Sequence, residues 1–233
     1  MNRELIVVAT IKSWNIQNFR HLRDKFSDDY DFILIENQSE LSYQYLADLS
    51  PRYIFFPHWS WIIPEKVYGN FECVLFHMTD LPFGRGGSPL QNLIVRDFEK
   101  TKISALKVSK ELDAGPIYLK KDLSLEGTAK EIFLRASDII FKEMIPVILE
   151  EKPVPIAQSG MPTAFKRRCK EDGNLISLKD LKEIYNYIRM LDAEGYPPAF
   201  LETDNFVFDF SRASLKEDGI FADVFIREKK KDE

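Results

Sequence analysis

Short apolar runs that alternate with helix-like stretches constrain this chain more than any other feature of its sequence. Four such runs lie in the first third, at Leu5–Ala9, Asp31–Glu36, Tyr53–Phe56 and Glu72–Phe76. The first is continuous and contains β-branched residues, which is typical of a strand buried on both faces. Helices are predicted between the runs, around 18–26, 42–49 and 64–68. Strands that alternate with helices form right-handed βαβ units, so we predict an α/β, Rossmann-like fold with a mostly parallel sheet.

The alternation continues to about residue 150 and then changes. A helix at 89–94, strands at 103–108 and 118–123, and a long amphipathic helix at 128–149 complete it. Pro153 and Pro155 interrupt the pattern, and the tail beyond Phe165 combines a helix around Leu181 with the alternating segments FVFDF and IFADVFI. We therefore expect a Rossmann-like domain over residues 1–160 and a small C-terminal α+β appendage over 161–233.

Charge and composition limit the partners of the chain. The net charge is −5 and no basic stripe precedes the last few residues, so we expect no nucleic-acid partner. No stretch approaches the roughly 18–20 apolar residues of a membrane span, and the first apolar run is too short for a signal peptide. Cys73 and Cys169 lie far apart, which favours a reduced, cytoplasmic setting. The three histidines lack clustered carboxylates, so no metal site is expected. The chain is also a candidate homodimer.

Two glycine-containing blocks carry the residues suited to chemistry. Phe76–Asn92 reads FHMTDLPFGRGGSPLQN, with His77 at its start and three glycines around Arg85. Glycines of this kind let a loop press its main chain against a ligand. Leu112–Ile117 reads LDAGPI and presents one carboxylate, Asp113. If both blocks end strands at the carboxyl edge of a parallel sheet, the histidine and the carboxylate meet in one cleft. Either block alone is equally consistent with a tight surface turn.

Together, the two blocks resemble the formyltransferases that use 10-formyltetrahydrofolate. The shared pattern is a histidine, a hydroxyl residue two places on, Leu-Pro, Arg-Gly-x-x-Pro, and then Asp-x-Gly-Pro-Ile. It falls here on His77, Thr79, Leu81-Pro82, Arg85-Gly86 with Pro89, and Asp113-Gly115-Pro116-Ile117. The resemblance covers roughly residues 51–123 and implies an enzyme with 10-formyltetrahydrofolate as its co-substrate.

The resemblance implies that His77 and Asp113 are catalytic. Formyl transfer to an amine passes through a tetrahedral oxyanion, so the site needs a hydrogen-bond donor and a route for protons. His77 can serve both needs, and Asp113 can orient its ring. The family usually has Asn two residues before the histidine, where this chain has Leu75. His58, Ser60, Thr79 and Asn92 are open candidates for the missing donor, and a loss of activity is the alternative.

The remaining site residues follow from the resemblance for the co-substrate, and from position and charge for the acceptor. Apolar walls for the pterin are expected from Trp61, Ile62 and Ile63, with Arg85, Gly86, Lys110, Glu111 and Leu112 also at the co-substrate. The acceptor is expected to meet Thr79 and the KSWN loop with Lys12, Trp14 and Asn15, while Arg167 and Arg168 hold its phosphates. Ordinary core packing is the alternative for Trp59 and Trp61, and a solvated charged turn is the alternative for the arginine pair.

The acceptor is predicted from the tail. The segment YIRMLDAEGYPPAF resembles a region of sugar N-formyltransferases, and the wording around His77 resembles the branch of pseudaminic-acid biosynthesis. That branch formylates a UDP-linked 4-amino-dideoxy-N-acetyl sugar, so we predict a nucleotide-linked amino sugar as substrate. The alternatives are methionyl-tRNA, whose enzyme carries a longer basic tail, glycinamide ribonucleotide, and a binding module for nucleotide sugar or folate without catalysis.

Overall fold

The chain forms two compact units, neither of which is one continuous stretch. The computed structural model describes residues 3–229. The first unit contains the chain up to Gly86, Lys102–Leu123 and Leu134–Ala164. The second contains Gly87–Thr101, Ser124–Phe133 and the chain from Phe165 onward. The boundary between a domain at residues 1–160 and an appendage at residues 161–233 stays a prediction.

A six-stranded sheet in the order β2-β1-β3-β4-β6-β7 forms the centre of the first unit. The strands are β1 (Glu4–Ala9), β2 (Tyr30–Ile35), β3 (Tyr53–Pro57), β4 (Cys73–His77), β6 (Lys100–Lys107) and β7 (Ile117–Ser124). The pairs β1–β2, β1–β3 and β3–β4 are parallel, whereas β4–β6 is antiparallel. The predicted α/β fold with a mostly parallel sheet is therefore confirmed.

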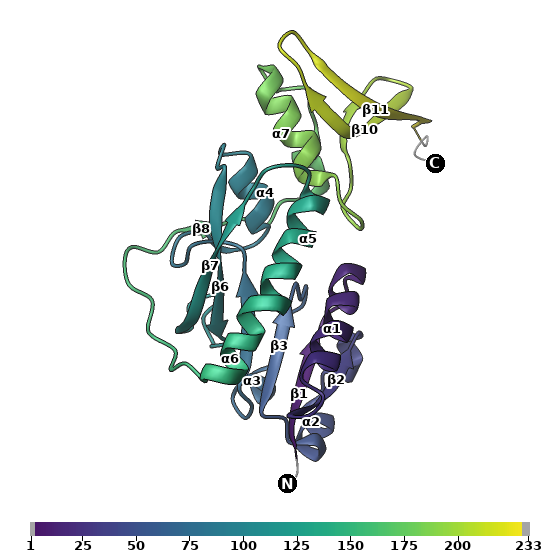
Figure 1. Cartoon of the computed structure of the whole chain (residues 1–233). Coiled ribbons are helices and arrows are strands. Elements are labelled where there is room, and N and C mark those ends of the chain that lie inside the picture. Colours follow the sequence, from purple (N-terminus) through teal and green to yellow (C-terminus); the bar gives the residue numbers. More distant parts are fainter. Residues whose placement is uncertain (1–2, 230–233) are drawn as a thin grey trace. The chain divides into compact units, whose positions relative to one another are not determined.

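Helices cover both faces of this sheet (Figure 1). They are α1 (Ser13–Lys25), α2 (Tyr43–Leu49), α3 (Glu65–Tyr68), α5 (Ala129–Ile139) and α6 (Ile145–Glu151), with a short 3₁₀ turn at Gln38–Glu40. Val7 and Phe56 share a buried cluster with Leu46 of α2 and Val67 of α3. Successive side chains of a strand alternate between faces, so fully buried Val8 faces the other helices. Burial on both faces explains the continuous apolar runs.

The long helix predicted at 128–149 is broken in the structure. Ile140–Met144 is a single π-helical turn between α5 and α6. Pro146 lies two residues beyond the end of this turn and has no backbone N–H to donate to it. A wider turn accommodates the missing hydrogen bond, and the helix continues. The amphipathic stripe is nevertheless as predicted, since Ile132, Ala136 and Ile148 are buried.

The second unit combines two helices with an antiparallel sheet, as the predicted α+β tail requires. Its elements are α4 (Pro89–Ile94), a 3₁₀ turn (Lys170–Gly173), α7 (Leu181–Leu191), β9 (Ala199–Glu202), β10 (Phe206–Leu215) and β11 (Ile220–Glu228). The strands form a sheet in the order β11-β10-β9. Leu175, Ile188 and Ala199 are the buried centre of a cluster between α7 and this sheet. The sequence did not predict β9, because four residues are too few to display an alternating pattern.

Arg189 on α7 ties distant segments of the second unit together. Its Nη1 donates to the carbonyl oxygens of Leu125 at 2.7 Å and Gly127 at 2.9 Å, and its Nε donates to Asn186 Oδ1 at 2.8 Å. The side chain is buried, and that burial lowers the pKa of its guanidinium. A buried cation of this kind needs its donors satisfied, and these carbonyls satisfy them.

Across residues 3–229, no helix has the length and apolar character needed to cross a membrane.

Candidate active site

His77 is the last residue of β4 and lies buried against the glycine loop that follows. Its Nε2 is 2.8 Å from the carbonyl oxygen of Gly84. A carbonyl oxygen can only accept, so Nε2 carries a hydrogen and donates it. Thr79 Oγ1 donates to the same carbonyl at 3.4 Å. The ring is therefore fixed in orientation, with Nδ1 directed away from Gly84.

Asp113 meets His77 on the Nδ1 side. Its Oδ2 lies 3.6 Å from His77 Nδ1, and both side chains are less than a tenth exposed. The same oxygen accepts from the backbone N–H of Gly86 at 2.8 Å. Asp113 adopts φ 52°, a left-handed conformation that few residues other than glycine take. The sequence predicted this meeting, and the structure brings the two groups together.

The route by which they meet differs from the prediction. We expected both loops to leave the same edge of a parallel sheet. However, β6 is antiparallel to β4, and its last residue Lys107 lies opposite Val74, near the start of β4. Asp113 reaches His77 because the loop 108–116 folds back along the sheet. Gly115 allows this close approach, since a Cβ there would stand 1.7 Å from the carbonyl oxygen of Lys107.

The shape of the glycine loop is fixed by its backbone conformation and by the hydroxyl of Thr163. Gly84 and Gly86 adopt φ 73° and 101°, which an L side chain rarely allows. The N–H of Gly84 donates to Thr163 Oγ1 at 2.8 Å, and the N–H of Arg85 donates to the Thr163 carbonyl at 2.9 Å. The loop thus presents the Gly84 carbonyl to His77 and the Gly86 N–H to Asp113.

Sequence reasoning missed Gln158, which contacts both loops. Its Oε1 accepts from Arg85 Nη2 at 2.8 Å and Nε at 3.2 Å. Its Nε2 donates to the carbonyl oxygens of Asp113 and Gly115 at 2.8 and 2.9 Å. Nothing in the segment around Gln158 resembles a motif, so its role becomes visible only in three dimensions.

Leu75 supplies no replacement for the family's asparagine. It pairs with Phe56 of β3 and Leu106 of β6 and packs against the core. Among the candidate donors, Thr79 is fully buried and shares its acceptor with His77. Asn92 uses its amide nitrogen on the carbonyls of Gly87, Ser88 and Lys166. Burial, with Lys12 contributing, lowers the pKa of His58 to about 3, so that ring is neutral at pH 7.

The residues expected at the pterin differ in exposure. Ile62 and Leu112 are 88% and 65% exposed, so both present apolar surface to solvent. Trp61 is partly exposed and packs edge to face on Trp59, with ring centroids 4.9 Å apart. Ile63 lies in the buried core, whereas Lys110 and Glu111 are exposed and Glu111 pairs with Arg85 at 3.3 Å. Their contacts with a pterin stay predictions.

The KSWN segment is not a loop. Lys12 is the N-cap of α1, and Ser13–Asn15 form its first turn, five residues before the predicted start at 18. Trp14 and Asn15 are buried. Asn15 Nδ2 donates to Thr10 Oγ1 at 2.8 Å and to the Pro57 carbonyl at 3.1 Å, so it joins the ends of β1 and β3. The interruption by polar residues after β1 concealed the early helix start.

Arg167 and Arg168 occupy the second unit. Arg168 Nη2 donates to the carbonyl of Asp172 at 2.9 Å, and its guanidinium lies 5.3 Å from the ring centre of Tyr187. Its Nε is buried without a hydrogen-bond partner. Arg167 is exposed, and its backbone and Cβ lie against Gly87, where an added Cβ would clash at 2.6 Å.

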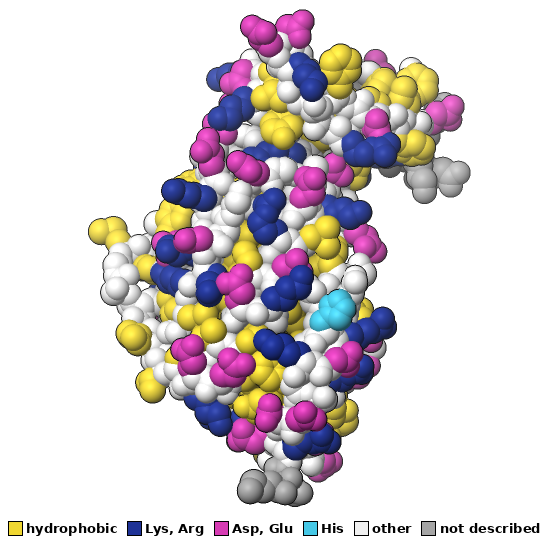
Figure 2. Space-filling view, in the orientation of Figure 1, with side chains coloured by type: hydrophobic (Ala, Val, Ile, Leu, Met, Phe, Trp, Pro, Cys, Tyr) yellow, Lys and Arg dark blue, Asp and Glu magenta, His cyan; other side chains and the backbone are white. Residues whose placement is uncertain are grey.

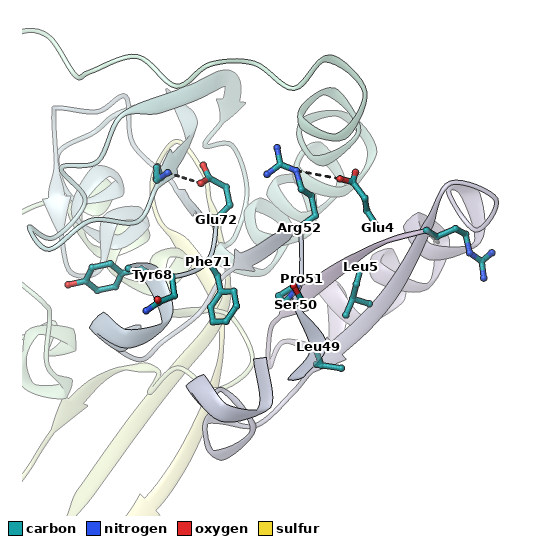
Figure 3. A pocket seen from close by; sticks show the side chains of 13 residues that line it. Glu4, Leu5, Leu49, Ser50, Pro51, Arg52, Tyr68, Phe71 and Glu72 are labelled. Carbon is teal, nitrogen blue, oxygen red and sulfur yellow. Dashed lines mark hydrogen bonds and ion pairs between the residues drawn. The ribbon is translucent and has the colours of Figure 1, made fainter. Parts of the chain in front are cut away.

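A hollow of about 670 Å³ lies at the start of β1, β3 and β4 rather than at His77 (Figure 3). Lys107 Nζ pairs with Glu72 at 2.7 Å, and Arg52 pairs with Glu4 at 3.7 Å. Glu72 also accepts from Tyr118, and these two hydrogen bonds outweigh burial and lower the pKa of the Glu72 carboxyl. The basic side chains of this hollow are therefore paired with carboxylates. No group of three or more potential metal ligands occurs among the described residues.

Comparison with known proteins identifies the family. A family model described as methionyl-tRNA formyltransferase, C-terminal domain, matches residues 170–227. A solved structure of a methionyl-tRNA formyltransferase from Clostridium thermocellum is 53% identical and aligns with a TM-score of 0.95, covering 97% of this chain and 100% of that one. A methionyl-tRNA formyltransferase from Nitratiruptor sp. is 28% identical over 71% of this chain and 55% of its own length. The chain spans about half the length of such curated relatives.

The fold is that of the formyltransferases, and within it His77 and Asp113 lie side by side. The predicted enzyme class and co-substrate agree with these relatives. Within this class, the chain belongs to the methionyl-tRNA formyltransferase family, as its 53% identity over nearly the whole chain requires.

The predicted acceptor was wrong. A sugar N-formyltransferase from Shewanella sp. shares the fold with a TM-score of 0.67 over 86% of this chain and 93% of that one, but only 14% of its sequence. The YIRML and YPPAF segments that suggested a sugar enzyme lie within the region matched by the methionyl-tRNA formyltransferase model. The similarity to methionyl-tRNA formyltransferases overturns two expectations, that of a nucleotide-linked amino sugar as acceptor and that of no nucleic-acid partner. Net charge misled, because it does not report where individual cations lie.

Proposed function

We propose that this chain transfers the formyl group of 10-formyltetrahydrofolate to the methionyl amine of methionyl-tRNA. The observation that carries the proposal is the buried contact of 3.6 Å between His77 and Asp113, in a chain 53% identical to a methionyl-tRNA formyltransferase. A cytoplasmic setting forms part of this proposal, since charged tRNA is a cytoplasmic substrate in bacteria.

The reaction forms one carbon–nitrogen bond and breaks another. The methionyl amine attacks the formyl carbon, the carbonyl oxygen becomes an oxyanion, and the bond to the folate nitrogen then breaks. The amine loses a proton and the departing folate nitrogen gains one. No redox change occurs, so the residues need only stabilise charge and move protons.

His77 is the proposed donor to the oxyanion. Its Nε2–H is directed at the Gly84 carbonyl, a position from which it can exchange that acceptor for the developing oxyanion. Asp113 would hold the opposite edge of the ring through Nδ1, while the Gly86 N–H keeps the carboxylate in place. Leu75 leaves the pair without the usual amide, so Thr79 is the hydroxyl proposed to assist.

The folate would lie against the exposed apolar side chains near these loops. Ile62, Leu112 and Trp61 are the proposed walls, and exposed Lys110 the proposed partner of the folate's carboxylates. Flat rings are commonly held by apolar surfaces and backbone groups, because these match both the faces and the edges of the ring.

The tRNA would be held by local cations rather than by a broad basic surface. Basic and acidic side chains are interspersed over the face drawn in Figure 2, in keeping with the net charge of −5. Arg167 is the proposed phosphate contact, because Arg168 already binds a carbonyl and an aromatic ring. Few phosphate contacts imply a weak dependence of binding on salt.

The test measures formyl-methionyl-tRNA by mass after incubation with 10-formyltetrahydrofolate. We expect formylation of methionyl-tRNA and none of free methionine. His77→Asn and Asp113→Asn should lower turnover by roughly 10²–10⁴-fold, because proton transfer and charge stabilisation are lost, and Tm shows that the variants remain folded. His21→Asn, an exposed change on α1, is the matched control. Absence of product with wild type, or wild-type turnover in both variants, would overturn the proposal.

A further inference from the structure

Gln158 lies in an extended segment between two anchored points. On one side, Ile156 exchanges backbone hydrogen bonds of 2.7 and 2.9 Å with Ile117. On the other, Thr163 binds the N–H groups of Gly84 and Arg85. The segment is therefore fixed to β7 and to the glycine loop, and the half-buried Gln158 side chain projects between them.

The amide of Gln158 is fully used. A glutamine has two N–H donors and two acceptor lone pairs. Here the two donors bind the carbonyls of Asp113 and Gly115, and the oxygen receives two N–H groups of Arg85. This partner set also fixes the assignment of nitrogen and oxygen, since carbonyls need a donor and a guanidinium needs an acceptor.

These four hydrogen bonds join the two loops that orient His77. Arg85 stands between Gly84, which accepts from the imidazole, and Gly86, which donates to Asp113. Gln158 holds the side chain of Arg85 and, with the same amide, the backbone on both sides of Ala114. Gln158 follows Asp113 by 45 residues and Arg85 by 73, so neither loop could build this link from its own sequence.

The Asp113 loop needs such a link because its conformation is unfavourable by itself. Asp113 has φ 52°, which few residues other than glycine adopt. Residues in sparsely populated conformations persist when surrounding contacts over-determine them. Arg85 has a second partner in Glu111 at 3.3 Å, but that carboxylate is largely exposed and therefore a weaker restraint.

We propose that Gln158 is a positioning residue, which sets the distance and orientation between His77 and Asp113 by clamping the loops that carry their partners. Gln158 contacts neither the His77 ring nor the Asp113 carboxylate, and its effect on catalysis passes through the Asp113 backbone and Arg85. The kinetic part of this inference rests on the proposed formyl transfer, whereas the structural part does not.

The experiment reads His77 directly. The chain has three histidines, so ¹⁵N-imidazole NMR gives a small set of signals, and His77→Asn identifies the one from His77. Gln158→Ala should move the His77 ring-nitrogen signals. Gln44→Ala, which removes an exposed glutamine of α2, should leave them unmoved.

Two further variants separate positioning from folding. Gln158→Met keeps the volume of the side chain and replaces Gln158→Ala if truncation lowers Tm. Gln158→Glu keeps the acceptors for Arg85 but loses both donors to the Asp113 turn. We expect both to displace the His77 signal, because each removes the donors to Asp113 and Gly115.

Kinetics supply the second readout. Release of formate from 10-formyltetrahydrofolate, with water as acceptor, reports the formyl-transfer site without tRNA. Its kcat should fall roughly 10–100-fold in Gln158→Ala while KM for the folate changes little, since a misplacement near 1 Å has an effect of that order. A wild type that formylates no tRNA, beside a Gln158→Ala variant with a displaced His77 signal, would refute the proposed function and support the positioning role. A folded variant with wild-type kcat and an unmoved His77 signal would refute the positioning role alone.

Discussion

Replacing Gly115 by alanine tests whether the close approach of the Asp113 turn to β6 is needed. The added Cβ would stand 1.7 Å from the carbonyl oxygen of Lys107. Protein contacts of this type are rarely shorter than about 3 Å, so turn and strand must separate by more than 1 Å. The position of the Cβ is fixed by the backbone and the Lys107 carbonyl is part of the backbone, so neither can rotate away as the end of a long side chain would.

The magnitude follows from that displacement. Overpacking of this kind costs typically about 1–3 kcal/mol, which for a chain of this size corresponds to a fall in Tm of roughly 2–12 °C. The Gly115 carbonyl accepts from Gln158, and Asp113 is two residues away. A shift of about 1 Å at a catalytic group can lower the rate roughly 10²-fold, so activity should suffer more than folding.

The assay combines thermal unfolding with formate release at saturating 10-formyltetrahydrofolate. Gly219→Ala is the matched control, because a Cβ at Gly219 meets nothing within 4 Å. We expect the control to match wild type in both measurements. Wild-type kcat and Tm in Gly115→Ala would refute the reasoning, since they would mean that the turn can separate from β6 without moving Asp113.

Two further predictions concern titratable groups. The hydrogen bond from Lys182, at 2.7 Å, together with one from Asn186, holds the pKa of Asp97 below its usual range. The stabilisation of the folded state is present above the ordinary carboxyl pKa of about 4, and it is lost as the pH falls through the lowered pKa of Asp97. Asp97→Asn should therefore lower Tm by no more than about 2 °C at pH 7 and should leave Tm unchanged at pH 2. An equal fall in Tm at both pH values would contradict this explanation. Burial raises the pKa of the Cys73 thiol to about 12, whereas Cys169 is exposed. Iodoacetamide at pH 8 should therefore label one thiol per folded chain, at Cys169, and labelling at Cys73 under folded conditions would count against the buried assignment.

The parts of the fold that the sequence predicted are those in which burial leaves a periodic trace. The runs at Leu5–Ala9 and Tyr53–Phe56 became β1 and β3, because both faces of these strands are covered and few polar residues are tolerated there. The start of α1 was placed too late, since its first turn carries Ser13 and Asn15 rather than an apolar stripe. The π-helical turn before Pro146 was not predicted either, as the stripe continues through it.

The site was predictable only as far as its motifs reach. His77 and Asp113 were expected to meet, and they do, but the antiparallel direction of β6 was not visible in a run of apolar residues. Strand direction depends on how the connecting segments pack, and the segment between β4 and β6 has no periodic signal for it. Gln158 was not predicted for a related reason. Its role depends on hydrogen bonds to Arg85 and Asp113, which are distant in sequence, and the residues next to it give no sign of these bonds.

The link made by Arg189 has a consequence for how the chain is made. The carbonyls of Leu125 and Gly127 precede Arg189 by 64 and 62 residues. At about 5–20 residues per second, a ribosome needs several seconds to add the missing guanidinium. During that interval the strands from β1 to β7 have all been synthesised, whereas the segments 87–101 and 124–133 still lack α7. The second unit must therefore be completed last, and early termination before Arg189 would leave these segments exposed to proteases and chaperones.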